Sequence, residues 1–441
     1  MTDEQDVKTP HPERRRWSSW QKISDACARR AERYPCIAVF LVGLLIFGLF
    51  NILPFLKESG HIGRAGAYHT HVRLAAALID GRIEFDSLFY KDIAIYQGHY
   101  YSPFPPFPAA FLIPFVLIFG QGLRTMLLTP LLGALTGVIL FRMFRKLALS
   151  TMVSSWATIA FLFGTVYWLM IREPLDTYFA HVMATGLVFL AIEAAASGRS
   201  GVVIGLYIGC AFLSRQLTVL ALPFVWVLML ERDATGTPLH RLRPLLATVP
   251  GLALCLGLYL SYNAIRFGDP LNCGYDLIVE PGWYGTRMAR WGVHHWSYIP
   301  SNFVHLFLQG FSVVFNDPHR MIPEMSPSGT SLTFASPFLF LALRGAFTKH
   351  PLLNATGWAG IALCTVAVMM NKNAMGGWQI NGVRYALDFM PVLLVFAARG
   401  MQHTVDSPIR RIWQGAIVYS VALNVLAIGV HYLPRIATLL A

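Results

Sequence analysis

The long apolar runs constrain the fold of this chain more than any other feature. The sequence contains roughly ten to twelve stretches of about 20 mostly apolar residues, the length that a helix needs to cross the hydrocarbon core of a bilayer. Only 13% of the residues are charged, which is too few for the surface of a soluble globular protein of this size. We therefore predict an all-α polytopic membrane protein, with residues 35–441 as the transmembrane domain and residues 1–34 as a polar, basic N-terminal segment.

The basic residues of the chain cluster beside the apolar runs. A net charge of +12 could indicate a nucleic-acid partner, but no basic surface with interleaved aromatic residues occurs away from these edges. Clusters of this kind mark the cytoplasmic ends of spans and predict a multi-pass protein with a cytoplasmic N-terminus. They lie at Arg14–Arg16, Arg142–Lys146, Arg232–Arg243 and Arg410–Arg411.

By the same charge bias, we expect two large loops on the extracytoplasmic side, residues 58–103 and 263–331, and a shorter one before Tyr385. In the first loop, residues 68–79 carry apolar side chains at helical spacing, and Asp80-Gly81 is a stop signal, which predicts a helix along the membrane surface. In the second loop, the semi-apolar stretch 303–315 predicts another surface-lying or partly inserted helix. The positions of the basic clusters also require that one of the two short apolar segments flanking Gly120 does not cross the membrane.

Five segments resemble the GT-C superfamily of polytopic glycosyltransferases, which includes protein mannosyltransferases and lipid A aminoarabinose transferases. The first loop supplies AALIDGRIEFD followed by KDIAIYQGHYYSPFPPFPA. Later segments are FLSRQLTVLALPF, YNAIRFGDPLNCGY, TFASPFLFLALRG and GGWQINGVRYALDFMP. The resemblance implies a GT-C-like fold in the cell inner membrane and a polyprenyl-phosphate-linked sugar as donor. Superfamily members often carry Asp or Asp-Glu at the start of the first-loop helix, where this chain has Gly66 to His69.

Transfer of a sugar from a polyprenyl phosphate needs a carboxylate for the acceptor and cations for the departing phosphate. Among the carboxylates of the first loop, we predict Asp92 and Asp86 as catalytic residues, because both lie in the segments that resemble the superfamily. The alternative for Asp86 is that it merely caps a turn.

For the donor phosphate, we predict Arg384, Arg266 and Arg73, since the planar fork of arginine suits bidentate phosphate binding. The alternative for Arg384 is a salt bridge to Asp388, and the alternative for Arg266 is an anchor at the lipid headgroups.

For the acceptor or the sugar, we predict a further set of polar and aromatic residues: His69, His71, Tyr101, Asp176 and His181. The alternatives are hydrogen-bonded interfacial histidines and, for Tyr101, an ordinary residue of the aromatic belt. We expect Arg215 to lie in a short connection at a membrane face.

These features predict a glycosyltransferase that acts on a cell-envelope lipid, polysaccharide or protein, with membrane lipids as further partners. Some members of the superfamily need a divalent cation, but no spacing of external carboxylates indicates a ligand set. The alternatives are a transporter or flippase of a lipid-linked precursor, and a catalytically inactive scaffold of the same fold.

Overall fold

The computed structural model describes residues 35–51, 69–89, 92–172, 176–232, 238–279, 282–315, 324–325, 329–372 and 383–440. The predicted N-terminal segment 1–34 and the start of the first loop, residues 58–68, lie outside these ranges.

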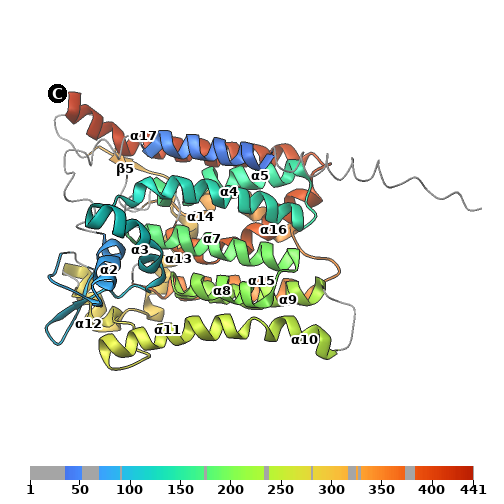
Figure 1. The fold of residues 1–441 in the computed structure, drawn as a ribbon. Helices are drawn as coiled ribbons and strands as arrows, with labels where there is room; N and C mark the ends of the chain where they lie inside the picture. Colours follow the sequence, from blue (N-terminus) through green and yellow to red (C-terminus); the bar gives the residue numbers. More distant parts are fainter. Residues whose placement is uncertain are drawn as a thin grey trace, which may run out of the picture.

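Long, roughly parallel helices form the body of the protein (Figure 1). In the described residues, five helices have the length and apolar character to cross a membrane: Thr125–Lys146, Thr177–Ser197, Leu242–Phe267, Pro351–Met369 and Ile409–Val430. They contain α4 (Thr129–Lys146), α7 (Asp176–Ser197), α11 (Val249–Phe267), α15 (Pro351–Met369) and much of α17 (Ile409–Leu440). The prediction of a helical membrane protein is thus confirmed, although five spans by this criterion are fewer than the ten to twelve expected.

Several of the other expected spans form shorter or interrupted helices beside these five. The run 153–171 is split at Thr165, whose extended backbone (φ −125°, ψ 175°) separates α5 (Thr151–Gly164) from α6 (Tyr167–Arg172). The run 332–343 becomes α14 (Leu332–Ala335) and the 3₁₀ helix η8 (Pro337–Arg344), because proline at 337 removes a backbone donor. The remaining elements here are the helix Pro35–Asn51, α8 (Gly201–Phe212), η4 (Gln216–Ala221), α9 (Leu222–Arg232), α10 (Pro238–Leu246), η9 (Arg384–Asp388) and α16 (Met390–His403).

Helix α7 lies at the centre of the bundle and α11 at its edge. Over the most apolar stretch of each helix, 83% of the α7 span is buried inside the protein, whereas only 22% of the α11 span is buried. Because α11 exposes apolar side chains, its outer face is suited to lipid. Glycines let α8 approach α11 closely, since a Cβ on Gly205 would overlap the backbone of Thr248.

The first loop folds into a small α/β cap at one end of the bundle. It contains α2 (Thr70–Ile79) and a three-stranded antiparallel sheet in the order β1 (Glu84–Phe85), β3 (His99–Tyr101), β2 (Ala94–Tyr96). The predicted helix and its stop are confirmed, with Asp80 as the C-cap and Gly81 at φ +72°. Most of its side chains are buried, because α3 (Phe107–Phe119) packs over it; its place along the membrane surface stays a prediction.

Helix α3 is the segment near Gly120 that lacks the length of a span. Its 13 residues reach about 20 Å, against a hydrocarbon core of about 30 Å. Two 3₁₀ turns, η2 (Gly120–Gly122) and η3 (Thr125–Leu127), lead from it into α4.

The second loop packs against this cap through an antiparallel bridge between Ala94 and Ile278. It contains η5 (Tyr275–Leu277), α12 (Gly282–Trp291), η6 (Trp296–Tyr298), α13 (Ile299–Phe303), the π-helix η7 (Val304–Leu308), and the paired strands β4 (Val313–Val314) and β5 (Glu324–Met325). The helix expected over 303–315 is therefore wrong beyond Leu308. Gln309 has an extended backbone (φ −64°, ψ 117°), and Val313–Val314 pair as strand β4.

Candidate functional site

A cavity of 290 Å³ opens where the two loops meet the ends of α7 and α15. Residues far apart in the sequence, from Asp92 to Tyr385, line it, so only the folded chain creates it. The lining side chains include Asp92, Phe104, Thr177, Arg215, Cys273, Tyr275, His294, Asn371, Lys372, Arg384 and Tyr385. Two residues predicted for different roles, Asp92 and Arg384, thus lie in one cavity.

The charged lining of this cavity is mainly cationic. Arg215, Lys372 and Arg384 line it together with one carboxylate, that of Asp92, among the described lining residues. The pKa of His294 is lowered, chiefly because burial disfavours its charged form, so this ring is neutral near pH 7. These charges suit the binding of an anionic group, such as a phosphate, next to a group that gives up a proton to a carboxylate base.

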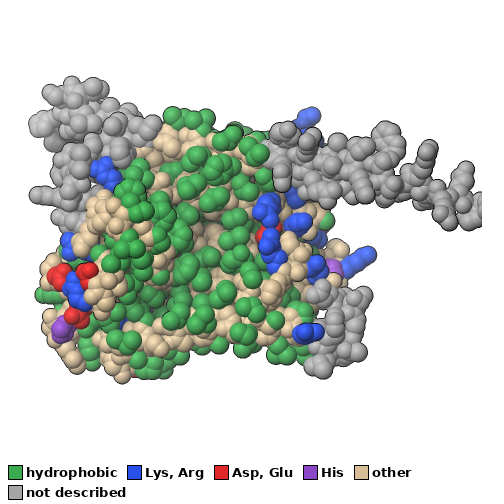
Figure 2. Space-filling view, in the orientation of Figure 1, with side chains coloured by type: hydrophobic (Ala, Val, Ile, Leu, Met, Phe, Trp, Pro, Cys, Tyr) green, Lys and Arg blue, Asp and Glu red, His purple; other side chains and the backbone are tan. Residues whose placement is uncertain are grey.

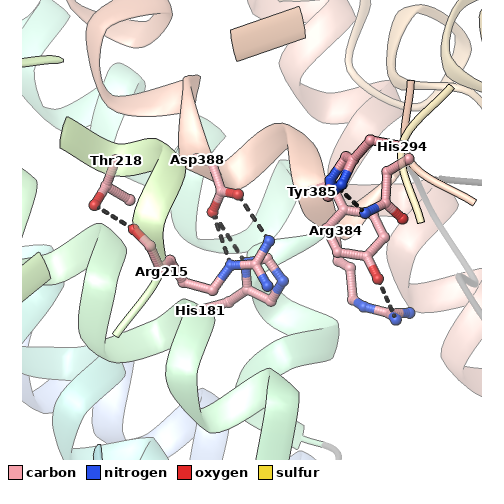
Figure 3. A network of polar contacts seen from close by, with 8 residues as sticks. His181, Arg215, Thr218, His294, Arg384, Tyr385 and Asp388 are labelled. Carbon is pink, nitrogen blue, oxygen red and sulfur yellow. Dashed lines mark hydrogen bonds and ion pairs between the residues drawn. The ribbon is translucent and has the colours of Figure 1, made fainter. Parts of the chain in front are cut away.

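One of the lining residues, Arg215, belongs to a largely buried ion pair with Asp388, which does not itself line the cavity (Figure 3). Arg215 donates from Nε to Oδ1 of Asp388 at 3.1 Å and from Nη2 to Oδ2 at 2.8 Å. His181 of α7 lies behind the pair, with Nδ1 3.6 Å from Oδ1 of Asp388. The Asp388 side chain is 1% exposed and that of Arg215 is 16% exposed, so the arginine alone of these two has appreciable access to the cavity.

Arg384 begins η9, one turn before Asp388, and has a different set of contacts. Its Nη2 donates to the Tyr385 hydroxyl at 3.1 Å, and its guanidinium lies over the rings of Tyr385 and Tyr178. The alternative expectation, a salt bridge from Arg384 to Asp388, is wrong, since both carboxylate oxygens of Asp388 accept from Arg215 instead. Its neighbours therefore hold the Arg384 side chain at the cavity wall.

The second predicted carboxylate, Asp86, lies away from the cavity. It forms an exposed ion pair with Arg82 four residues earlier, and its side chain is 76% exposed. An ion pair with a side chain is not a turn cap, so the turn-capping alternative stays a prediction. Arg73 does not line the cavity either, and its guanidinium lies 4.0 Å from the centre of the Phe89 ring.

Arg266 joins the two loops and is not among the cavity-lining residues. Its guanidinium is buried and donates to the carbonyl oxygens of Tyr262 and Ser102 and to Oδ1 of Asn263. Because Ser102 ends the first loop and Arg266 ends α11, these bonds fix the cap to the bundle. Each of the three guanidinium nitrogens donates within the fold, which favours a structural role for Arg266; the phosphate contact stays a prediction.

The residues predicted for the acceptor are dispersed. His69 and His71 are buried under α3, beside Phe179 and Phe104, and Tyr101 packs against Phe267.

His181 lies behind the cavity wall, against Asp388. The Asp176 side chain lies outside the described residues, although the next residue, Thr177, lines the cavity.

Sequence reasoning missed Lys372, Tyr385 and His294 and assigned Arg215 to a mere connection. The signal for Arg215 was present, because an ionisable group between two apolar runs is costly at membrane depth unless it has a partner. The partner, Asp388, lies 173 residues later, which no local pattern discloses.

Among the residues that the structure describes, no group of three or more His, Cys, Asp or Glu side chains is placed to hold a metal ion. No model of a known protein family matches the chain, and no curated protein matches it significantly.

Proposed function

We propose that the protein is a membrane glycosyltransferase that moves a sugar from a polyprenyl-phosphate donor to an extracytoplasmic cell-envelope acceptor. One observation carries this proposal: Asp92 shares a cavity with the cations Arg215, Lys372 and Arg384. A carboxylate and several cations in one cavity are the groups that such a transfer needs.

The proposed step uses Asp92 as the general base. Its carboxylate takes the proton of an acceptor hydroxyl, whose oxygen then forms a bond to the anomeric carbon. The bond from that carbon to the phosphate oxygen breaks, and the phosphate leaves with the electron pair. Attack opposite the leaving group inverts the anomeric centre.

Arg384 and Lys372 supply charge where the phosphate develops it. The planar guanidinium of Arg384 offers two parallel donors to a phosphate, and the aromatic rings beside it fix its orientation in advance. Arg215 is committed to Asp388 and contributes mainly its field. The cavity lies at one end of the apolar bundle, which allows the polyprenyl tail to remain in the bilayer.

Replacement of Asp92 tests the role of the base. In liposomes with a labelled polyprenyl-phosphate sugar and a cell-envelope extract as the acceptor source, we expect Asp92→Asn to slow the release of polyprenyl phosphate by about 10²–10⁴-fold. The matched control is Asp86→Asn, which removes the same charge from an exposed position of the same loop and should leave the rate within about twofold. Equal losses in both variants would contradict the proposal.

Replacement of Arg384 tests the phosphate contact. We expect Arg384→Lys to keep the charge but lose the paired donors, weakening donor binding by about tenfold, and Arg384→Gln to weaken it further. The dependence of the initial rate on donor concentration measures donor binding in both variants. Donor binding that is unchanged in Arg384→Gln would remove this residue from the site.

The same liposomes separate the two alternatives. Movement of the donor across the bilayer without release of polyprenyl phosphate would identify a transporter. Normal cell-envelope glycan in cells that carry Asp92→Asn would identify a scaffold.

A further inference from the structure

A second concentration of cations lies at the end of the bundle opposite the candidate site. A cavity of 410 Å³ opens there between the ends of α4, α9 and α16 and the start of α15. Lys146, Arg232, Lys349 and Arg399 line it. Figure 2 shows basic side chains gathered at this end, beyond the apolar surface of the helices.

A neighbouring cavity of 270 Å³ lies between the α7–α8 turn and the α10–α11 junction. Arg199, Arg232 and Arg243 line this one, so Arg232 belongs to both cavities. The guanidinium of Arg232 lies against the backbone of Gly198, in the place that a side chain would occupy. Gly198 also has φ +65°, a conformation that favours glycine, and it therefore allows Arg232 to reach this position.

Few anionic groups balance these cations. Among the described lining residues of the two cavities there is one carboxylate, Glu231, and it lies 2.7 Å from Nδ1 of His350. The orientation of the protein in the membrane requires only that basic residues lie at this end. It does not require six of them to surround two cavities that share an arginine.

Phosphate is the anion that such a site suits, because guanidinium groups bind it with paired, charge-assisted hydrogen bonds. The position of the two cavities in the bundle indicates the source of this phosphate. Beside the smaller cavity, Leu246 and Val249 are 61% and 49% exposed, and α11 continues as the least buried of the five long helices. A headgroup in the cavities would therefore leave its acyl chains against an apolar helix.

From this geometry we infer that the two cavities form one binding site for the phosphate groups of an anionic phospholipid headgroup, distinct from the candidate site at the opposite end. Basic pockets between helices at a membrane face are a known means of binding such lipids. The site does not depend on the proposed glycosyltransferase activity.

Thermal unfolding of the delipidated, full-length protein in neutral detergent tests this inference. We expect phosphatidylglycerol and cardiolipin to raise the midpoint of unfolding at low mole fraction, and phosphatidylcholine to have little effect. Inorganic phosphate and pyrophosphate form the second arm. A rise with these ions at equal phosphate concentration would show that the site takes a soluble phosphate instead, and would overturn the assignment to a lipid.

The variant Arg232→Gln/Lys349→Gln removes two lining charges and should weaken lipid binding by about tenfold or more. The same rise in the midpoint of unfolding should then need about tenfold more lipid. The control variant Arg410→Gln/Arg411→Gln removes the same charge from exposed positions at the start of α17 and should bind lipid like the unmodified protein. Two results would overturn the inference: an equal loss in the control, which would indicate diffuse surface attraction, or no preference for anionic lipid over phosphatidylcholine. Unfolding midpoints without lipid establish that each variant folds.

Discussion

At the scale of single residues, the ion pair of Arg215 with Asp388 is the costliest feature of the candidate site. Two charges removed from water stabilise a protein only when they satisfy one another. Asp388 is 1% exposed, and it receives two hydrogen bonds from Arg215 and faces His181. Arg215, at 16% exposed, retains access to water in the cavity. Asp388 therefore depends on Arg215 to satisfy its charge more than Arg215 depends on Asp388.

This inequality predicts the outcome of removing each partner. Arg215→Gln leaves a carboxylate buried without its counter-ion and should lower the free energy of unfolding by about 3–5 kcal/mol. Asp388→Asn leaves an arginine that can turn to the cavity, so its cost should be smaller, about 1–3 kcal/mol. Denaturant unfolding of the single and double variants in detergent measures both effects.

The double variant provides the control for this pair. Because the two side chains interact directly, we expect its cost to be smaller than the sum of the single costs by about 1–3 kcal/mol. Additive costs, or a larger cost for Asp388→Asn than for Arg215→Gln, would show that the pair does not determine the stability of this region.

At the scale of elements, α2 carries two histidines in an apolar setting under α3. His69 and His71 are 3% and 0% exposed, and among the described residues neither ring makes a hydrogen bond to a side chain. Burial lowers the pKa of His69 to about 3 and that of His71 well below its usual value. Both rings are therefore neutral in the folded cap.

Because both pKa values lie below that of a free histidine, acid destabilises the cap. In the unfolded cap each ring binds a proton below about pH 6.5. In the folded cap His69 does not bind one until about pH 3, and the pKa of His71 is also lowered well below its usual value, so stability falls as the pH decreases below about 6.5. At pH 5 the loss should be about 2 kcal/mol for each ring. Hydrogen exchange of the α2 amides at pH 5 and pH 7.5, corrected for the intrinsic rate, measures it.

The double variant His69→Phe/His71→Phe is the control for this prediction. It keeps aromatic side chains under α3 but cannot titrate, so protection of its α2 amides should be the same at both pH values. Acid-dependent exchange that persists in this variant would place the sensitive group elsewhere.

At the scale of the whole molecule, the two ends of the bundle differ in the loops, cavities and charges that lie there. The polar loops and the candidate cavity occupy one end, and the basic cavities occupy the other (Figures 1 and 2). The excess of arginine and lysine at the second end predicts that it faces the cytoplasm. The candidate cavity would then open on the extracytoplasmic side.

Cysteine labelling in intact cells tests this orientation. In a variant that keeps Cys273 as its only cysteine, we expect a membrane-impermeant maleimide to react from outside, because Cys273 lines the candidate cavity. In a variant whose only cysteine is Asp406→Cys, between α16 and α17, reaction should require permeabilised cells. The opposite pattern would place the cavity in the cytoplasm and contradict the proposed extracytoplasmic transfer.

The sequence by itself determined the helical membrane class, the helix that ends at Asp80, and the candidacy of Asp92 and Arg384. Hydropathy, helical spacing and stop signals are local properties, and they can be read along the chain without knowledge of contacts. The continuity of the apolar runs was less predictable. At the break at Thr165, a distant helix takes part, because Asn424 Nδ2 donates to the carbonyl oxygens of Phe163 and Thr165.

Only the tertiary structure decided which charges meet. Asp388 lies one helical turn after Arg384, yet it pairs with Arg215, 173 residues away. Arg266 lies in a segment as suggestive as that of Arg384, yet all three of its guanidinium nitrogens donate within the fold. A buried charge must find its partner among all residues that the fold brings within hydrogen-bonding distance, and that choice depends on the packing of helices distant in the sequence.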